Sequence, residues 1–200
     1  MRDPDLLPHS GVQDKYRDTR DVNHIKQRKT EALIHLQQIE NLIKSKSPEF
    51  TPQSILEIGS GMGSVTAGLR TLFPKAQILA SDIDRDPEIK QAAQANGATF
   101  DRNDIVTKSP QQFAAILQKY TIDSIIAMRT SGKVARYLLK ATQEANFDGL
   151  LTFSLITMSD RSSLPGISAT VATLGGQSLD LHSDNPFTEE TAFVINFSSK

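Results

Sequence analysis

The sequence predicts an α/β fold: a mostly parallel sheet of seven strands, flanked by helices and completed by an antiparallel C-terminal hairpin. Three observations predict it. Short apolar runs alternate with helix-like segments after residue 50, one run breaks into a glycine-rich turn, and a short loop joins the last two runs. Strands that alternate with helices favour parallel pairing, whereas a short connection between two strands requires antiparallel pairing.

The first strand is expected over residues 55–58, and it runs directly into the turn Gly59-Ser60-Gly61-Met62-Gly63. Glycine permits a positive φ and lets a ligand approach the backbone with no Cβ in the way. The helix expected over residues 64–73 begins with free N–H groups that attract negative charge. Strand, turn and helix start together predict a nucleotide-type binding site.

The second strand is expected over residues 77–81 and ends in Asp82-Ile83-Asp84. An acid about twenty residues past the glycine turn of an open parallel sheet is placed to bind a ribose. We predict that Asp82 binds the ribose, with Ile83 packing on the adenine and Asp84 as the alternative acid.

The remaining elements keep the alternation, and their starts carry the residues typical of helix N-termini, such as Asp86-Pro87 and Ser109-Pro110. The run over 122–128 is almost entirely apolar, as in a central strand buried on both faces. Further strands are expected over 98–101, 150–158, 177–181 and 191–197, and further helices over 87–96, from residue 110, after residue 132 and over 167–174.

The stretch from Glu57 to Gly63 reads acid-x-Gly-x-Gly-x-Gly and resembles the first motif of the class I S-adenosylmethionine (SAM) dependent methyltransferases, which have a Rossmann-like fold. The dinucleotide fingerprint instead requires a glycine where this chain has Ser64 or Thr66. The resemblance covers about residues 50–200, final hairpin included. It implies that the turn wraps the methionine end of SAM and that Glu57 helps to hold its ammonium group.

The resemblance also implies contacts farther along the cofactor. Asp104 is expected to meet the adenine amino group, and Ile105 to add a backbone or apolar contact. Tyr16, in the N-terminal arm, is expected to close over the bound cofactor. The cofactor-binding residues are therefore expected to be Glu57, Gly59, Ser60, Gly61, Gly63, Asp82, Ile83, Asp104, Ile105 and Tyr16.

The methyl acceptor is expected beyond the carboxyl ends of the strands, where Arg129 follows the fourth strand and Asp160 the fifth. Arg129 could clamp an acceptor carboxylate or phosphate, and Asp160 could act as a base or anchor an amine. A surface salt bridge or a helix cap is the alternative for each residue.

Residues 1–50 differ in kind from the rest of the chain. We expect a flexible arm over 1–22 and a single domain over 23–200, with an N-terminal helix over 23–46 and the core from residue 50. One face of this helix is apolar and should pack on the domain. The opposite face carries Lys26, Arg28, Lys29, Lys44 and Lys46, which we interpret as a solvated face, so nucleic acid is not the expected partner.

Composition excludes several chemistries. The chain has no cysteine, so disulfides, thiolate metal sites and cysteine nucleophiles are impossible. The four histidines show no metal-ligand spacing and are expected to be ordinary surface or packing residues, so no metal is expected. The formal net charge is −1, and no membrane span or signal peptide is evident, which predicts a cytoplasmic protein without a membrane partner.

The acceptor is expected to be a small molecule, by elimination. Enzymes that methylate adenine amines or glutamine carry Asn/Asp-Pro-Pro-aromatic after the fourth strand, where this chain reads Met128-Arg129-Thr130-Ser131. The chain also has no large insertion with which to recognise a macromolecule. Transfer to oxygen or to nitrogen remains open, as do two other classes: a SAM-binding regulatory module without turnover and an NAD(P)-dependent oxidoreductase.

Overall fold

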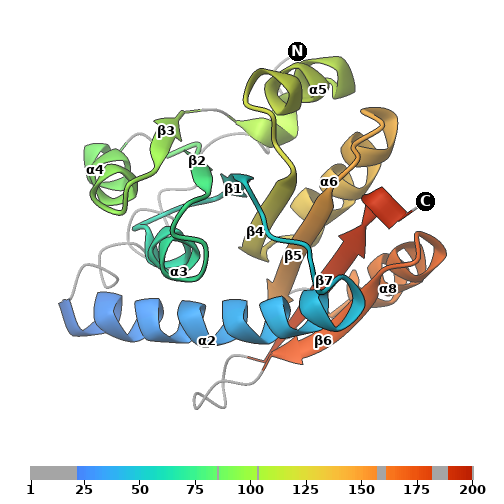
Figure 1. Ribbon diagram of the computed structural model, residues 1–200, viewed down its shortest axis with the longest axis horizontal. Helices are drawn as coiled ribbons and strands as arrows, with labels where there is room; N and C mark the ends of the chain where they lie inside the picture. The colour runs from blue at the N-terminus through green and yellow to red at the C-terminus, as the bar shows by residue number, and fades with distance from the viewer. Residues whose placement is uncertain (1–21, 85, 103, 157–160, 182–188, 200) are drawn as a thin grey trace.

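The computed structural model describes residues 22–84, 86–102, 104–156, 161–181 and 189–199. Seven strands form one sheet in the order β3-β2-β1-β4-β5-β7-β6 (Figure 1). All neighbouring strands pair in parallel except β7, which is antiparallel to both β5 and β6. The strands are β1 (Ser54–Ile58), β2 (Gln77–Ser81), β3 (Thr99–Asp101), β4 (Ser124–Thr130), β5 (Leu150–Ile156), β6 (Gln177–Leu181) and β7 (Glu190–Asn196). The predicted mostly parallel sheet with a C-terminal hairpin is confirmed.

Helices cover both faces of the sheet. Consecutive residues of β1 show this, because Ile55 packs with Leu36 and Leu69 on one face while Leu56 packs with Phe113 and Leu138 on the other. The first face is covered by α2 (Val22–Lys46), α3 (Ser64–Leu72) and α4 (Pro87–Ala95). The second is covered by α5 (Pro110–Lys119), α6 (Gly132–Glu144) and α8 (Leu164–Thr173). Short 3-10 turns lie at η3 (Ile105–Thr107) and η4 (Phe197–Ser199).

The long helix α2 lies along one side of the sheet, from α3 to β6 (Figure 1). Its middle packs closely on α3 at Gly68, where an added Cβ would come within 2.7 Å of a Leu36 methyl carbon. Its second half packs on the sheet through Ile39, which clusters with Leu181 and Val194. None of the described helices has the length and apolar character that a membrane span requires.

Strand β4 begins and ends two residues later than the apolar run suggested. Ile122 is buried, but it belongs to the turn after α5, where its N–H donates to the carbonyl of Leu117. Pairing with β5 becomes irregular between Ala127 and Thr130, and Arg129 has a φ of 55°. Arg129 therefore belongs to the irregular end of β4, rather than to a loop that follows the strand.

Candidate cofactor and acceptor site

The glycine turn after β1 is open on one side. A Cβ on Gly59 or Gly61 would meet no atom within 4 Å, and these residues have φ of 76° and 47°. Gly63 differs, because its added Cβ would come within 3.0 Å of the Asn96 amide nitrogen on the α4 side. The first two glycines therefore border free space that a ligand can enter, while the third allows close packing within the fold.

Glu57, at the end of β1, is 1% exposed and uses only one of its two carboxyl oxygens. Oε2 accepts a hydrogen bond of 2.7 Å from the Thr66 hydroxyl, whereas Oε1 has no partner among the described residues. The Ser60 hydroxyl, in the adjoining turn, is buried and equally without a partner there. Burial raises the pKa of Glu57 to about 8, and the charge of Asp82 adds to the effect. A buried carboxyl with a vacant oxygen fits a cationic ligand group.

Asp82 follows β2 and ties the glycine turn to it. Its Oδ2 accepts a hydrogen bond of 2.8 Å from the Gly61 N–H, and its Oδ1 accepts one of 2.9 Å from the Asp84 N–H. Ile83 lies between the two acids and is 63% exposed, which is unusual for a large apolar side chain. The structure thus brings together the glycine turn, the predicted ribose acid and an apolar surface suited to a base.

The third predicted contact follows β3. Asp104 has a buried Oδ1 without a partner among the described residues, so it can accept a hydrogen bond from a ligand. The Ile105 side chain is 3% exposed and packs in the core, which leaves its backbone for the contact predicted there. Burial, and then the charge of Asp104, raise the pKa of Tyr137 to about 12. Tyr16 and Asp160 lie outside the described residues.

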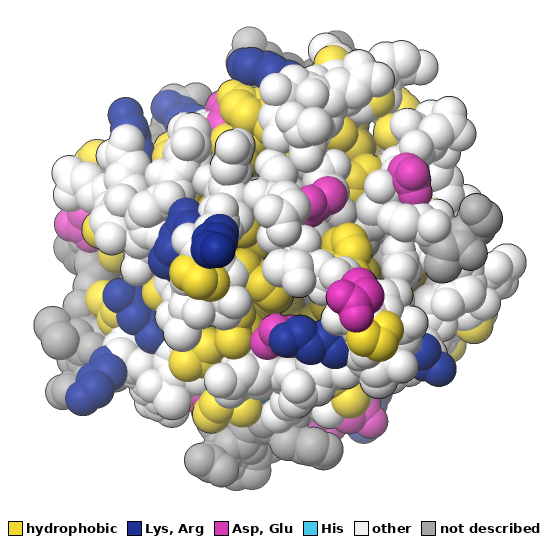
Figure 2. All heavy atoms as spheres, in the orientation of Figure 1, with side chains coloured by type: hydrophobic (Ala, Val, Ile, Leu, Met, Phe, Trp, Pro, Cys, Tyr) yellow, Lys and Arg dark blue, Asp and Glu magenta, His cyan; other side chains and the backbone are white. Residues whose placement is uncertain are grey.

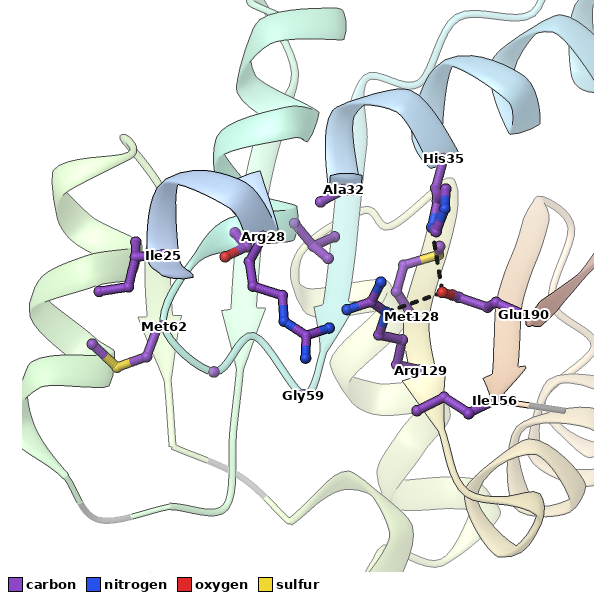
Figure 3. Close-up of a pocket in the computed structure, with 13 residues that line it drawn as sticks. Ile25, Arg28, Ala32, His35, Gly59, Met62, Met128, Arg129, Ile156 and Glu190 are labelled. Atoms are coloured by element: carbon purple, nitrogen blue, oxygen red, sulfur yellow. Dashed lines mark hydrogen bonds and ion pairs between the residues drawn. The ribbon is translucent and has the colours of Figure 1, made fainter. Parts of the chain in front are cut away.

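A cavity of about 320 Å³ extends from the glycine turn to the start of β7 (Figure 3). Its walls come from three parts of the fold. The turn and α3 contribute Gly59, Gly61, Met62, Ser64 and Val65; α2 contributes Ile25, Arg28, Ala32 and His35; the strand ends contribute Met128, Arg129, Ile156 and Glu190. The α2 residues are three or four positions apart and so share one helix face.

Glu190 is the centre of a buried polar network in this cavity. It is 2% exposed and pairs with Ile156 at the carboxyl edge of the sheet. Its Oε2 lies 3.3 Å from Nδ1 of His35 and 3.0 Å from Nε of Arg129, which both point toward it in Figure 3, and its Oε1 accepts a short hydrogen bond from Ser154. Burial alone would raise the pKa of Glu190, but the hydrogen bonds from His35 and Ser154 and the charge of Arg129 lower it overall.

Arg129 is held by two carboxylates. Besides Glu190 it contacts Glu31 of α2, with 3.1 Å between Nη2 and the carboxylate oxygen. Arg28, which was expected on a solvated face, instead lines the cavity and lies 3.8 Å from the same Glu31. In Figure 3 it extends from α2 toward the glycine turn.

The sequence did not single out His35 or Glu190 as site residues. His35 was expected to be an ordinary surface or packing residue, and it is buried in the cavity wall. Within the described ranges, no group of three His, Asp or Glu side chains is placed to hold a metal ion.

No protein-family model matches this chain, and no curated protein sequence matches it with significance. Several solved structures do match the fold of this chain. The plantazolicin methyltransferase BpumL, in complex with a monoazolic desmethylPZN analog and SAH, has a TM-score of 0.62 at 13% identity, over 93% of this chain and 91% of that chain. The N-terminal domain of human METTL16 in complex with SAH has a TM-score of 0.62 at 12% identity, over 82% and 70%.

Magnesium protoporphyrin IX methyltransferase (ChlM) from Synechocystis PCC 6803, with bound SAH, matches over 95% of each chain, with a TM-score of 0.56 at 15% identity. At these identities the likeness establishes the fold. The chain has the α/β fold of the class I SAM-dependent methyltransferases.

Proposed function

We propose that this protein is a SAM-dependent methyltransferase that transfers a methyl group to an oxygen or nitrogen atom of a small molecule. One observation carries the proposal: the open glycine turn is tied by its Gly61 N–H to Asp82, and it lies beside the buried vacant oxygen of Glu57. Solved structures of the same fold, including BpumL and ChlM, contain SAH, the product that SAM leaves after methyl transfer.

The residues fit SAM part by part. Free space over Gly59 and Gly61 accommodates the methionine chain, and the vacant Glu57 oxygen is suited to its ammonium. Each Asp82 oxygen accepts one backbone hydrogen bond, and a carboxylate oxygen has a second lone pair with which to accept another from a ribose hydroxyl.

The exposed Ile83 side chain offers a surface for the adenine, and the vacant Asp104 oxygen accepts from its amino group. When bound, SAM supplies a methyl group activated by a sulfonium. The protein then has to align the acceptor and exclude water.

The cavity supports a small acceptor. The cavity of about 320 Å³ includes the space over Gly59 and Gly61, and away from the turn it is lined by apolar side chains such as Met128 and Ile156. BpumL and ChlM are named for acting on plantazolicin and magnesium protoporphyrin IX. Arg129 and Asp160 remain predicted acceptor contacts. For Arg129, no contact with a described residue engages Nη1, and that nitrogen could bind the acceptor.

The test has two parts. Calorimetry should show that SAH binds the purified protein and that NAD does not. Incubation with methyl-labelled SAM and a small-metabolite extract should then label a small molecule, which mass spectrometry identifies. Binding of NAD instead of SAH would favour an oxidoreductase. Binding of SAH without labelling of any acceptor would favour a regulatory module.

A further inference from the structure

His35 has an unusual environment for a histidine. Its side chain is 1% exposed and borders the cavity, and its Nε2 atom has no hydrogen-bond partner among the described residues. A buried polar atom without a partner costs free energy unless a ligand or a water molecule provides one. The residue lines the same cavity as Gly59 and Gly61, so it forms part of the wall beside the proposed cofactor.

The partner of Nδ1 decides which ring nitrogen carries the proton. Glu190 is held ionised by its lowered pKa, and an ionised carboxylate only accepts hydrogen bonds. Nδ1 of His35, 3.3 Å from Glu190, must therefore carry a proton. Arg129 already supplies the positive charge beside this carboxylate, at 3.0 Å. In an imidazole ring that carries its single proton on Nδ1, Nε2 has a free lone pair.

We propose, on the basis of the proposed methyl transfer, that Nε2 of His35 accepts the proton of the methyl acceptor and that this acceptor is a hydroxyl group on an apolar body. The acceptor oxygen forms a bond to the methyl carbon, the carbon–sulfur bond breaks with its electron pair going to sulfur, and the hydroxyl proton passes to Nε2. Glu190 keeps the ring oriented and stabilises the imidazolium through Nδ1.

A proton acceptor in the cavity wall favours a hydroxyl over an amine as the methyl acceptor. Arg28 and Arg129 line the cavity, but the carboxylates of Glu31 and Glu190 lie beside them, so the charges there roughly balance. A neutral amine attacks with its own lone pair and needs no base beforehand. A hydroxyl is a weak nucleophile until a base removes its proton, which is the role proposed for Nε2. The apolar part of such an acceptor is matched by Met62, Met128 and Ile156.

The binding test uses the SAH-loaded protein with phenol as the hydroxyl probe and toluene as the matched control. Nitrogen NMR of the histidine rings, with the His35→Gln variant assigning the signal, should show His35 protonated at Nδ1. Phenol should shift its Nε2 signal saturably and toluene should not. A ring protonated at Nε2 instead, or a response to phenol no larger than that to toluene, would overturn the proposal.

The turnover test uses labelled SAM and the acceptor fraction identified with the unaltered protein. His35→Gln should lower turnover roughly 10²- to 10⁴-fold, the usual contribution of a general base, while SAH affinity stays within about twofold. Ile34→Gln, at an exposed neighbouring position on α2, is the control and should leave both unchanged. Equal turnover in His35→Gln, or parallel losses of turnover and SAH affinity, would reject the base. Failure of the unaltered protein to bind SAH would instead reject the methyltransferase proposal itself.

Discussion

At the scale of single residues, two buried glutamates have pKa values that are shifted in opposite directions. Glu57 has one hydrogen bond from a side chain and a raised pKa, whereas Glu190 has three polar side chains around it and a lowered pKa. The difference follows from the neighbours, because burial raises the pKa of both carboxyls and only Glu190 has enough donors and positive charge to reverse it. We infer that a cationic group of a ligand is the partner of Glu57, whereas Glu190 already has its partners within the protein.

The raised pKa of Glu57 predicts a pH-dependent stability. Between its ordinary value of 4.5 and about 8, the folded protein holds a proton that the unfolded chain has lost. The stability that this proton contributes is fully present below 4.5 and is lost as the pH rises through about 8. The free energy of unfolding of the unaltered protein should therefore fall by up to roughly 1.4 kcal/mol per pH unit in this window, relative to Glu57→Gln. Urea unfolding at pH 5 to 8 measures it.

Glu190→Gln is the control for that experiment. The lowered pKa of Glu190 gives stability that is present above its ordinary pKa and is lost only as the pH falls. The slope between pH 5 and 8 should therefore persist in Glu190→Gln. If Glu57→Gln kept the slope of the unaltered protein, the carboxyl of Glu57 would not be its source.

The two acids after β2 should differ in their effect on cofactor binding. Asp82→Ala removes a carboxylate that orders Gly61 and that we propose binds the ribose, so SAH affinity should fall by about 10- to 100-fold, equivalent to roughly 1.5–3 kcal/mol. Asp84→Ala should cost much less. Calorimetry measures both, and equal losses would mean that the ribose contact has been assigned to the wrong acid.

At the scale of elements, two glycines can be compared to distinguish a role in ligand binding from a purely structural role. Gly61, in the turn, and Gly175, after α8, both have a positive φ and both have no atom within 4 Å of an added Cβ. Alanine should destabilise the fold by a similar amount at each, roughly 1–2 kcal/mol. Only Gly61→Ala should also weaken SAH binding, because only its Cβ enters the proposed cofactor space. Similar SAH affinities in the two variants would remove the turn from the site.

The sequence predicted the elements whose signals are local. Asp86 caps α4 by accepting from the Glu88 N–H, and Ser109 and Gln112 form a reciprocal capping box at the start of α5, as the Asp-Pro and Ser-Pro pairs indicated. The glycine turn was equally predictable, since its positive φ values depend on residues adjacent in the chain. These signals sufficed for the fold and for the geometry of the glycine turn.

The contacts around the proposed acceptor could not be predicted from the sequence. His35 and Glu190 are 155 positions apart, and they meet only because α2 packs on the sheet while β7 runs in reverse, which returns Glu190 to the carboxyl edge. Arg28 was assigned to a solvated face because helical spacing does not show what lies opposite each face. Contacts of this kind depend on how elements pack, and no pattern within either segment specifies that packing.

At the scale of the whole molecule, α2 connects the two halves of the site. One face of its first part lines the cavity, while Ile39, Leu42 and Ile43 pack against the sheet at β5, β6 and β7. On the face shown in Figure 2, acidic and basic side chains are both present and are scattered among neutral and hydrophobic ones. The first part of α2 therefore faces the proposed cofactor, and the second part is fixed to the sheet by apolar contacts.

This arrangement predicts how ligand binding affects α2. Ligand contacts at the cavity stabilise the segment that makes them, so SAH should slow amide hydrogen exchange more in residues 25–35 than in residues 36–46, which are already anchored. Mass spectrometry of exchanged peptides measures the difference. Gly61→Ala at the same SAH concentration is the control and should show little change in either segment. Equal protection of both halves would mean that α2 responds as one rigid unit, and no protection in the first half would separate α2 from the cofactor site.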